Sequence, residues 1–257
     1  MKRTLIPSVP LVLITISSLL SPACKKEDHH PDGHPQCSIQ QLKGDLGFAL
    51  SDSAVFVYNA KGDPVSITRT IPTTGHPNYL FYYDAHRRLT DYIGVYSDGV
   101  HFEFRRRYGY DSKNRIVQDT LFTFGALTDP PQQWYVELIT TYTYDARNRI
   151  IRQDDQHPRT GGRYIMRYVY NEEGNLEKVY NGNSVIFTYT YDNKVNLHRT
   201  HPVWQFIDRD FSVNNPFQAI TYNKRGLPLK VESDPTKFDK YFLGIAYHQL
   251  EVSYSCR

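Results

Sequence analysis

Residues 164–174 read Tyr164-Ile165-Met166-Arg167-Tyr168-Val169-Tyr170-Asn171-Glu172-Glu173-Gly174, a stretch with two successive patterns. In its first seven residues every second side chain is aromatic or long and apolar, a period of two that is typical of a β-strand. In its last five residues an Asn opens a type I turn and a Gly closes it in the left-handed conformation. We therefore expect a strand that runs directly into a hairpin turn.

The same five-residue pattern, Tyr followed by Asp or Asn and closed by Gly or Asn, recurs along the chain. Its seven copies begin at Tyr58, Tyr83, Tyr110, Tyr144, Tyr170, Tyr191 and Tyr222. Five copies end on a residue for which we expect positive φ: Gly62, Asn114, Asn148, Gly174 and Gly226. Two copies carry Arg87 and Val195 at this position instead, and in the second of these Asn196 could take over the turn.

Composition agrees with strands, because 21 Tyr and 13 Phe raise the aromatic content to 14%. We expect an all-β fold, a meander of antiparallel β-hairpins over residues 38–257. Seven hairpins would give about fourteen strands, and a sheet of that size curls. The predicted sheet is therefore strongly twisted and forms a half-shell or a barrel-like structure. Phe102, Phe104, Tyr108 and Tyr110 are expected on one face of a strand.

The seven copies resemble the YD repeats of Rhs-type proteins over about residues 55–235. The stretch from Tyr191 to Leu229 is also similar to a group of uncharacterised bacterial surface lipoproteins, in which a Ser-x-Asn-Asn element precedes a final Tyr-Asn-x-x-Gly-x-Pro copy. Ser212-Val213-Asn214-Asn215 and the residues from Tyr222 to Pro228 match that order. The group has Asn-Pro where this chain has Asn196-Leu197. The resemblance implies a fold and a surface location, and no catalytic residue.

The amino terminus has the pattern of a lipoprotein signal peptide, predicted for residues 1–23. A basic start, Met1-Lys2-Arg3, precedes a short apolar segment that ends at Leu20, and Ala23-Cys24 follows. This resembles the lipobox, although Leu20 lies four residues before the cysteine rather than three. We expect lipidation, by palmitate among other chains, at Cys24. The expected location is the outer membrane, and Lys25-Lys26-Glu27-Asp28 resembles an export tag for the cell surface.

Residues 24–37 form a predicted flexible tether, in which His29, His30, Asp32 and His34 could bind a metal but are better explained as linker residues. The remaining cysteines, Cys37 and Cys256, lie at the two ends of the predicted domain. In an oxidising compartment they could form a disulfide, or they could remain as two free thiols.

Charge and motifs exclude several functions. The formal net charge of +3 falls when Lys2 and Arg3 leave with the signal peptide, and Arg105-Arg106-Arg107 should divide between two strand faces, so no nucleic acid partner is expected. The sequence has no phosphate-binding loop, nucleophile elbow or CxxC pair, and we predict no cofactor and no metal. Asp154-Asp155 with His157, and His198 with His201, are interpreted as loop residues.

These observations favour a non-catalytic cell-envelope lipoprotein that binds an extracellular glycan or protein. A purely structural envelope protein is the first alternative, and a hydrolase that acts on envelope polymers is the second. Candidate ligand-binding residues are Trp134 and Trp204, because both follow turn-forming residues and a loop Trp can stack on a sugar. Alternatively, each ring folds back and fills an open end of the curled sheet.

Overall fold

A computed structural model of the chain describes residues 37–44, 46, 52–232, 241–246 and 249–256. The predicted signal peptide, Cys24 and the tether residues before Cys37 lie outside these ranges. All statements below concern the compact unit formed by residues 34–257.

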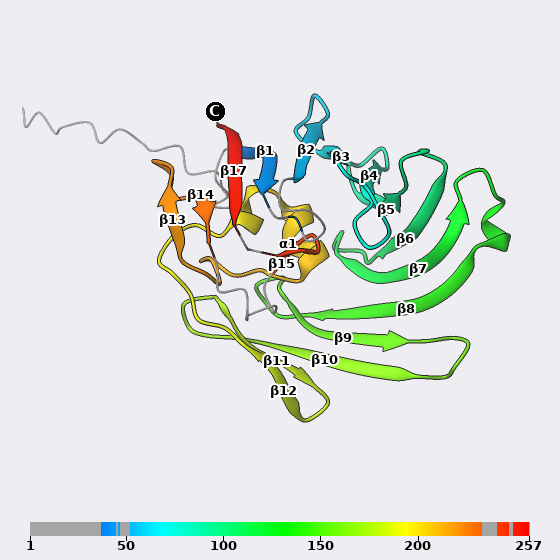
Figure 1. Cartoon of the computed structure of the whole chain (residues 1–257). Helices are drawn as coiled ribbons and strands as arrows, with labels where there is room; N and C mark the ends of the chain where they lie inside the picture. The colour runs from blue at the N-terminus through cyan, green and yellow to red at the C-terminus, as the bar shows by residue number, and fades with distance from the viewer. Residues whose placement is uncertain (1–36, 45, 47–51, 233–240, 247–248, 257) are drawn as a thin grey trace, which may run out of the picture. The chain divides into compact units, whose positions relative to one another are not determined.

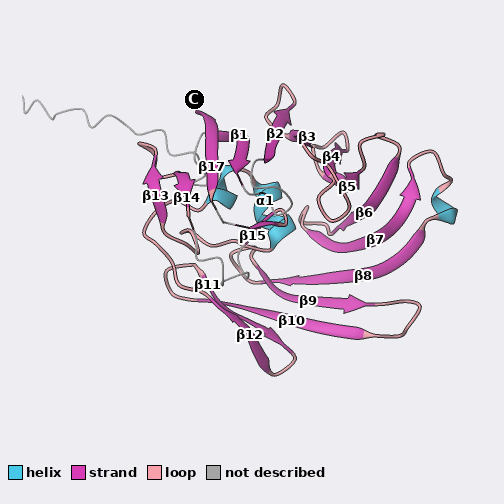
Figure 2. Ribbon diagram, viewed as in Figure 1, coloured by secondary structure: helices cyan, strands magenta, loops and turns pink. Residues whose placement is uncertain are grey.

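The chain forms one fifteen-stranded sheet and one small two-stranded sheet (Figures 1 and 2). The fifteen strands are β1 Cys37–Gly44, β2 Asp52–Tyr58, β3 Pro64–Arg69, β4 Asn78–Tyr83, β5 Leu89–Val95, β6 His101–Tyr110, β7 Ile116–Ala126, β8 Tyr135–Tyr144, β9 Ile150–Gln156, β10 Arg163–Tyr170, β11 Leu176–Asn181, β12 Ser184–Thr188, β13 Ala219–Tyr222, β14 Pro228–Val231 and β17 Leu250–Cys256. The small sheet pairs β15 Tyr241–Phe242 with β16 Ile245–Ala246. The helices are η1 Pro131–Gln133, η2 Leu197–Thr200 and α1 Pro202–Asp208.

Every strand pair in the large sheet is antiparallel, and strands β1 to β12 follow one another in sequence order. The predicted all-β meander is therefore confirmed. Its two outermost strands, β12 and β13, do not pair with each other, so the sheet is curled but open. The order differs from a simple meander at one place, because β17 returns to pair with β1 and brings β14 and β13 with it.

The repeat turns have the backbone that their sequence predicts. All five expected closing residues have positive φ, at 86° for Gly62, 59° for Asn114, 57° for Asn148, 90° for Gly174 and 78° for Gly226. The Asp or Asn side chain holds each turn; Asp111 Oδ1, for example, accepts from the backbone N–H of Lys113 and of Arg115, both at 2.9 Å. Arg87 also has a positive φ, 63°, without being Gly or Asn.

The sixth copy does not form a hairpin. Val195 instead bridges to Asn214, and Asn196, with φ of −62°, caps η2 by accepting from the His198 N–H at 2.9 Å. The expectation that Asn196 closes this turn is therefore wrong. Residues 197–217 leave the meander as an insert. The Asp192 carboxylate accepts from the Lys194 N–H at 2.9 Å, as in the other copies, but it also accepts from the backbone and the side chain of Asn215 at the end of the insert.

Six repeat turns lie along one edge of the sheet. In an antiparallel meander, alternate turns lie at the same edge, and the β13–β14 turn has the same orientation through β17 and β1. We call this edge the repeat rim, defined by residues 58–63, 83–88, 110–115, 144–149, 170–175 and 222–227. The β5–β6 and β7–β8 connections lie at the opposite edge.

Neighbouring copies are joined by their tyrosines. The hydroxyl of Tyr110 donates to the Leu89 carbonyl at 2.8 Å, and Tyr144 donates to Ile116 at 2.6 Å. The acceptor in each case lies six residues after the Tyr of the preceding copy. Tyr254 in β17 has the same relation to the last copy, since it donates to the Pro228 carbonyl at 2.7 Å.

The insert packs against one face of the sheet and forms the main core with it (Figure 1). Phe206 of α1 makes edge-to-face contacts with Tyr108 on β6 and Tyr142 on β8, at centroid distances of 5.3 and 5.4 Å. Leu197 is fully buried in the same cluster. A sheet that curls around an apolar insert buries its inner face without closing into a barrel.

Strand β6 does not place its aromatic residues as expected. Phe104 packs against the main core, but Phe102 belongs to a second apolar cluster with Ile93, Val95 and Phe122. A register shift between Gly94 and Val95 accounts for this difference, because a bulge changes which side chains share a face.

No helix in the described part of the chain has the length and apolar character needed to cross a membrane.

Candidate functional site

The two cysteines at the ends of the domain are joined. Cys37 and Cys256 are opposite each other in the β1–β17 pairing and form a disulfide, which closes a loop of 219 residues. Cys24 lies outside the described residues, as do His29, His30, Asp32 and His34.

Trp204 is completely buried on α1. Its ring makes edge-to-face contacts with Phe56, Phe81 and Phe242, at centroid distances of 5.8, 5.5 and 5.8 Å. The ring therefore lies between β2 and β4 of the large sheet and β15 of the small sheet. It cannot reach an external ligand.

Trp134 is 8% exposed and lies in the second cluster. Its indole N–H donates to the Ala126 carbonyl at 3.1 Å, its ring packs edge-to-face on Phe102 and Phe122, and the Arg105 guanidinium covers it at 4.3 Å. The structure therefore buries both tryptophans, and the expectation of exposed Trp platforms is wrong. The large apolar area of an indole favours burial over exposure wherever a strand surface is available to cover it.

An open pocket of about 540 Å³ lies beside the buried Trp134 cluster, at the edge opposite the repeat rim. We call it the rim pocket. It is formed by the β5–β6 connection and by the end of β7. Its lining residues are Tyr96, Asp98, His101, Phe102, Phe124, Gly125, Ala126 and Asp129.

Phe124 is the most unusual residue of this pocket. Its side chain is 70% exposed, and its φ of 48° lies in the left-handed region, which a bulky residue rarely adopts. The neighbouring Gly125 has no room for a side chain, since a Cβ there would lie 2.7 Å from Phe102. The backbone at the end of β7 therefore turns the Phe124 ring outward instead of into the cluster below.

The polar side of the rim pocket is an ordered Asp-His pair. Asp98 accepts from the backbone N–H groups of Val100 and His101 and lies 2.7 Å from His101 Nδ1. The hydrogen bond from His101, with those two backbone N–H groups, lowers the pKa of Asp98 to about 2. Asp98 thus stays ionised and fixes the imidazole, while His101 Nε2 remains available to a ligand.

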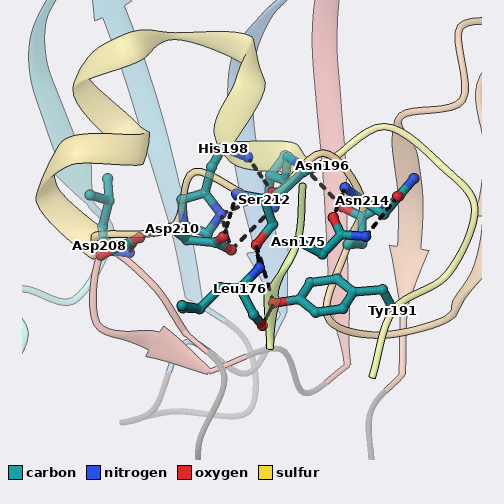
Figure 3. A network of polar contacts seen from close by, with 12 residues as sticks. Asn175, Leu176, Tyr191, Asn196, His198, Asp208, Asp210, Ser212 and Asn214 are labelled. Atoms are coloured by element: carbon teal, nitrogen blue, oxygen red, sulfur yellow. Dashed lines mark hydrogen bonds and ion pairs between the residues drawn. The ribbon is translucent and has the colours of Figure 1, made fainter. Parts of the chain in front are cut away.

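A second group of polar residues lies in the interior and fastens the insert (Figure 3). His198 Nε2 lies 2.7 Å from Asp208 Oδ2, and its Nδ1 lies 3.0 Å from Asn196 Oδ1 and 3.5 Å from Asp210 Oδ2. Asp208 also accepts from the Leu243 backbone N–H at 2.8 Å, so it connects η2, α1 and the β15–β16 turn. Burial lowers the pKa of His198, but the hydrogen bond that its ring donates to Asp208 and the charges of both carboxylates outweigh burial and raise it.

The same network continues to the fifth repeat copy. Ser212 Oγ accepts from the Leu176 N–H at 3.0 Å and donates to the Tyr191 hydroxyl at 3.1 Å, and Tyr191 donates to the Leu176 carbonyl at 2.5 Å. Asn175 and Asn214 exchange two hydrogen bonds of 3.0 and 2.9 Å (Figure 3). These residues are buried or half-buried and are satisfied by one another, so this network fastens the insert to the fifth repeat copy.

Other candidates from the sequence are also accounted for. His201 caps α1 by accepting from the Val203 N–H at 3.2 Å. Asp154 lies on β9 and pairs with Arg163 at 2.7 Å, rather than lying in a loop. His157 follows β9 and lies 3.4 Å from Glu137. Within the described residues no group of three His, Cys, Asp or Glu could hold a metal ion.

The basic run divides between two sheet faces, as the strand period predicts. Arg105 and Arg107 both contact Asp91, at 2.7 and 3.1 Å, whereas Arg106 pairs with Asp119 at 2.8 Å.

A second pocket, of about 600 Å³ and mostly polar, lies beside the sixth and seventh copies and is lined in part by Asp192, Lys194 and Tyr222.

Comparison with known proteins finds no matching family model and no similar curated protein. Among solved structures, the crystal structure of TcdB2-TccC3-Cdc42 matches with a TM-score of 0.31 and 17% identity, over 76% of this chain and 11% of that chain. The crystal structure of TcdB2-TccC3 without its hypervariable C-terminal region matches with a TM-score of 0.27 and 15% identity, over 57% of this chain and 9% of that one. This chain thus spans about a tenth of the length of either. With TM-scores below 0.5, neither match indicates what this chain binds or does.

Proposed function

We propose that this protein is a non-catalytic lipoprotein of the bacterial cell envelope, built from YD-type hairpin repeats, and that it binds an extracellular glycan in the rim pocket. The lipid anchor and the outer-membrane location rest on the sequence around Cys24. The repeat family rests on the seven copies that begin with Tyr58 and end with the Tyr222 copy.

The exposed Phe124 ring is the observation that points to a glycan as the ligand. An aromatic side chain that is 70% exposed gives up the free energy of burial, about 1.5 to 3 kcal/mol for a Phe. A left-handed φ adds roughly 1 to 2 kcal/mol. A ring held outward at this cost is suited to a ligand that covers it, and the C–H face of a pyranose does so.

The polar groups of the rim pocket fit the same ligand. Asp98 is an ionised acceptor, and His101 Nε2 and the Tyr96 hydroxyl offer further hydrogen bonds to sugar hydroxyls. Mixed aromatic and polar lining around one concavity is usual for small-molecule sites, and a volume of about 540 Å³ is within their ordinary range. An extracellular protein would need a larger apolar surface than this pocket presents.

The test is binding of the full-length chain to an array of neutral and acidic oligosaccharides, followed by titration calorimetry on those it retains. Phe124→Gly removes the ring and suits the positive φ, so it should abolish binding without unfolding the protein. Tyr164→Ala removes another exposed aromatic residue, 53% exposed and outside the pocket, and should leave binding unchanged. Equal binding by the wild type and Phe124→Gly would reject the proposal and favour a purely structural role.

A further inference from the structure

The fourth residue of the repeat is basic in six of the seven copies. These residues are Lys61, His86, Lys113, Arg147, Lys194 and Arg225, and all six are exposed. The fifth copy has Glu173 at this position. The first four basic residues belong to successive hairpins, and we call them the basic row.

The carboxylates of the same turns do not neutralise the basic row, because other arginines engage them. Asp84 pairs with Arg88 at 2.7 Å and Asp111 with Arg115 at 2.8 Å. In the same way Asp145 pairs with Arg149 at 2.7 Å, and Asp63 with Arg87 at 2.6 Å. The charge that remains at the turn tips is therefore positive at Lys61, Lys113 and Arg147, whereas His86 counts as neutral at pH 7.

The topology places the basic row along one edge of the curled sheet. All four turns belong to the repeat rim, and successive turns are two strands apart. Strands lie 4.7–4.9 Å from their neighbours, so successive members of the row are separated by about 10 Å and the whole row spans roughly 30 Å. Direct contacts keep neighbouring turns together, since Arg87 donates to the Lys61 carbonyl at 3.1 Å.

We infer that the basic row binds a linear acidic polysaccharide that carries one carboxylate per disaccharide. The length of a disaccharide unit is similar to the spacing of two strands, so successive carboxylates can meet successive turn tips. This site is separate from the rim pocket, which lies at the opposite edge of the sheet. It does not depend on the function proposed for that pocket.

The spacing distinguishes this ligand from other polyanions. Duplex DNA carries one charge per about 1.7 Å, far denser than one cation per hairpin. An anionic membrane surface presents its charges in a plane, whereas the repeat rim presents its cations in single file along a curved sheet edge. A sparsely charged linear polymer is therefore the best match in density and in shape.

The experiment titrates the full-length chain, in detergent, with hyaluronan oligosaccharides long enough to span four hairpins. Dextran, a DNA duplex and vesicles containing phosphatidylglycerol are titrated in parallel. Combined Lys61→Glu, Lys113→Glu and Arg147→Glu should weaken hyaluronan binding about tenfold or more. Combined Lys43→Glu, Arg159→Glu and Lys230→Glu changes the net charge equally at exposed sites away from the repeat rim and should have little effect.

Glu173→Lys extends the row toward Lys194 and should strengthen hyaluronan binding. Phe124→Gly, at the opposite edge, should leave hyaluronan binding unchanged, which separates this site from the rim pocket. Equal losses in both triple variants would overturn the inference, because they would show that only net charge matters. Stronger binding to DNA or to vesicles than to hyaluronan would also overturn it.

Discussion

The guanidinium carbon of Arg149 lies 4.1 Å from the centre of the Tyr170 ring, while its Nε donates to Asp145 at 2.8 Å. Asp145 belongs to the fourth repeat copy and Tyr170 begins the fifth, so one side chain joins two hairpins. Arg88 and Arg115 have the same relation to the next tyrosines, Tyr110 and Tyr144, at 4.8 and 4.9 Å. The repeats are therefore held side by side through the Arg that lies five residues after the Tyr in each of these three copies.

Replacing Arg149 with Ala should lower the free energy of unfolding by about 1 kcal/mol, because a cation–π contact and a half-buried ion pair are lost together. Urea denaturation measures the change. Arg147→Ala, in the same turn but exposed, is the control and should have almost no effect. If the two variants were equally stable, Arg149 would not join the hairpins.

His198 predicts a pH dependence of stability. Its folded pKa is raised, so its stabilising contribution is complete below about pH 6.5, the unfolded value, and is lost as the pH rises through the folded pKa. The free energy of unfolding of the wild type should therefore fall relative to that of His198→Gln between pH 6 and pH 9. Parallel denaturation curves for the two proteins across this window would contradict the assignment.

The disulfide between Cys37 and Cys256 should stabilise the domain strongly. Its loop of 219 residues gives an upper estimate of roughly 5 kcal/mol from chain entropy. Cys37→Ser with Cys256→Ser should lower the midpoint of urea denaturation, and a reductant should then have no further effect. An unchanged midpoint would mean that the β1–β17 pairing holds the ends together without the bond.

Lipidation at Cys24 is tested by metabolic labelling with palmitate. The wild type should incorporate label and fractionate with membranes, and Cys24→Ala should do neither, since each buried methylene contributes about 0.8 kcal/mol to membrane binding. Cys37→Ser serves as the control for loss of a cysteine and should still be labelled. Equal labelling of Cys24→Ala and the wild type would reject the anchor.

Local features of the fold could be predicted from the sequence. The turn at Gly174 depends on residues adjacent in the chain, and Asn171 with Gly174 is sufficient to specify it. The period of two before Tyr170 likewise reports a strand directly. Some copies have an Arg at the sixth position, such as Arg149. An ion pair within the turn could be predicted for them, because the Arg follows an Asp four residues earlier.

Features that depend on distant contacts could not be predicted. Trp204 follows His201-Pro202, which indicates a turn, but its burial depends on Phe56 and Phe81, more than a hundred residues away. The position of β17 in the sheet depends on its pairing with β1 at the other end of the domain, and no local sequence pattern predicts that pairing. Phe124 lies in an ordinary strand-like run, and its outward orientation results from the packing of Phe102 over Gly125.

Saturation-transfer difference NMR on a bound oligosaccharide shows whether Phe124 is the surface on which a glycan packs. The ring should transfer saturation mainly to the C–H protons of one pyranose face, and Phe124→Gly should abolish this pattern while Tyr164→Ala retains it. A uniform transfer to all sugar protons, or the same pattern in Phe124→Gly, would show that the glycan does not pack on this ring.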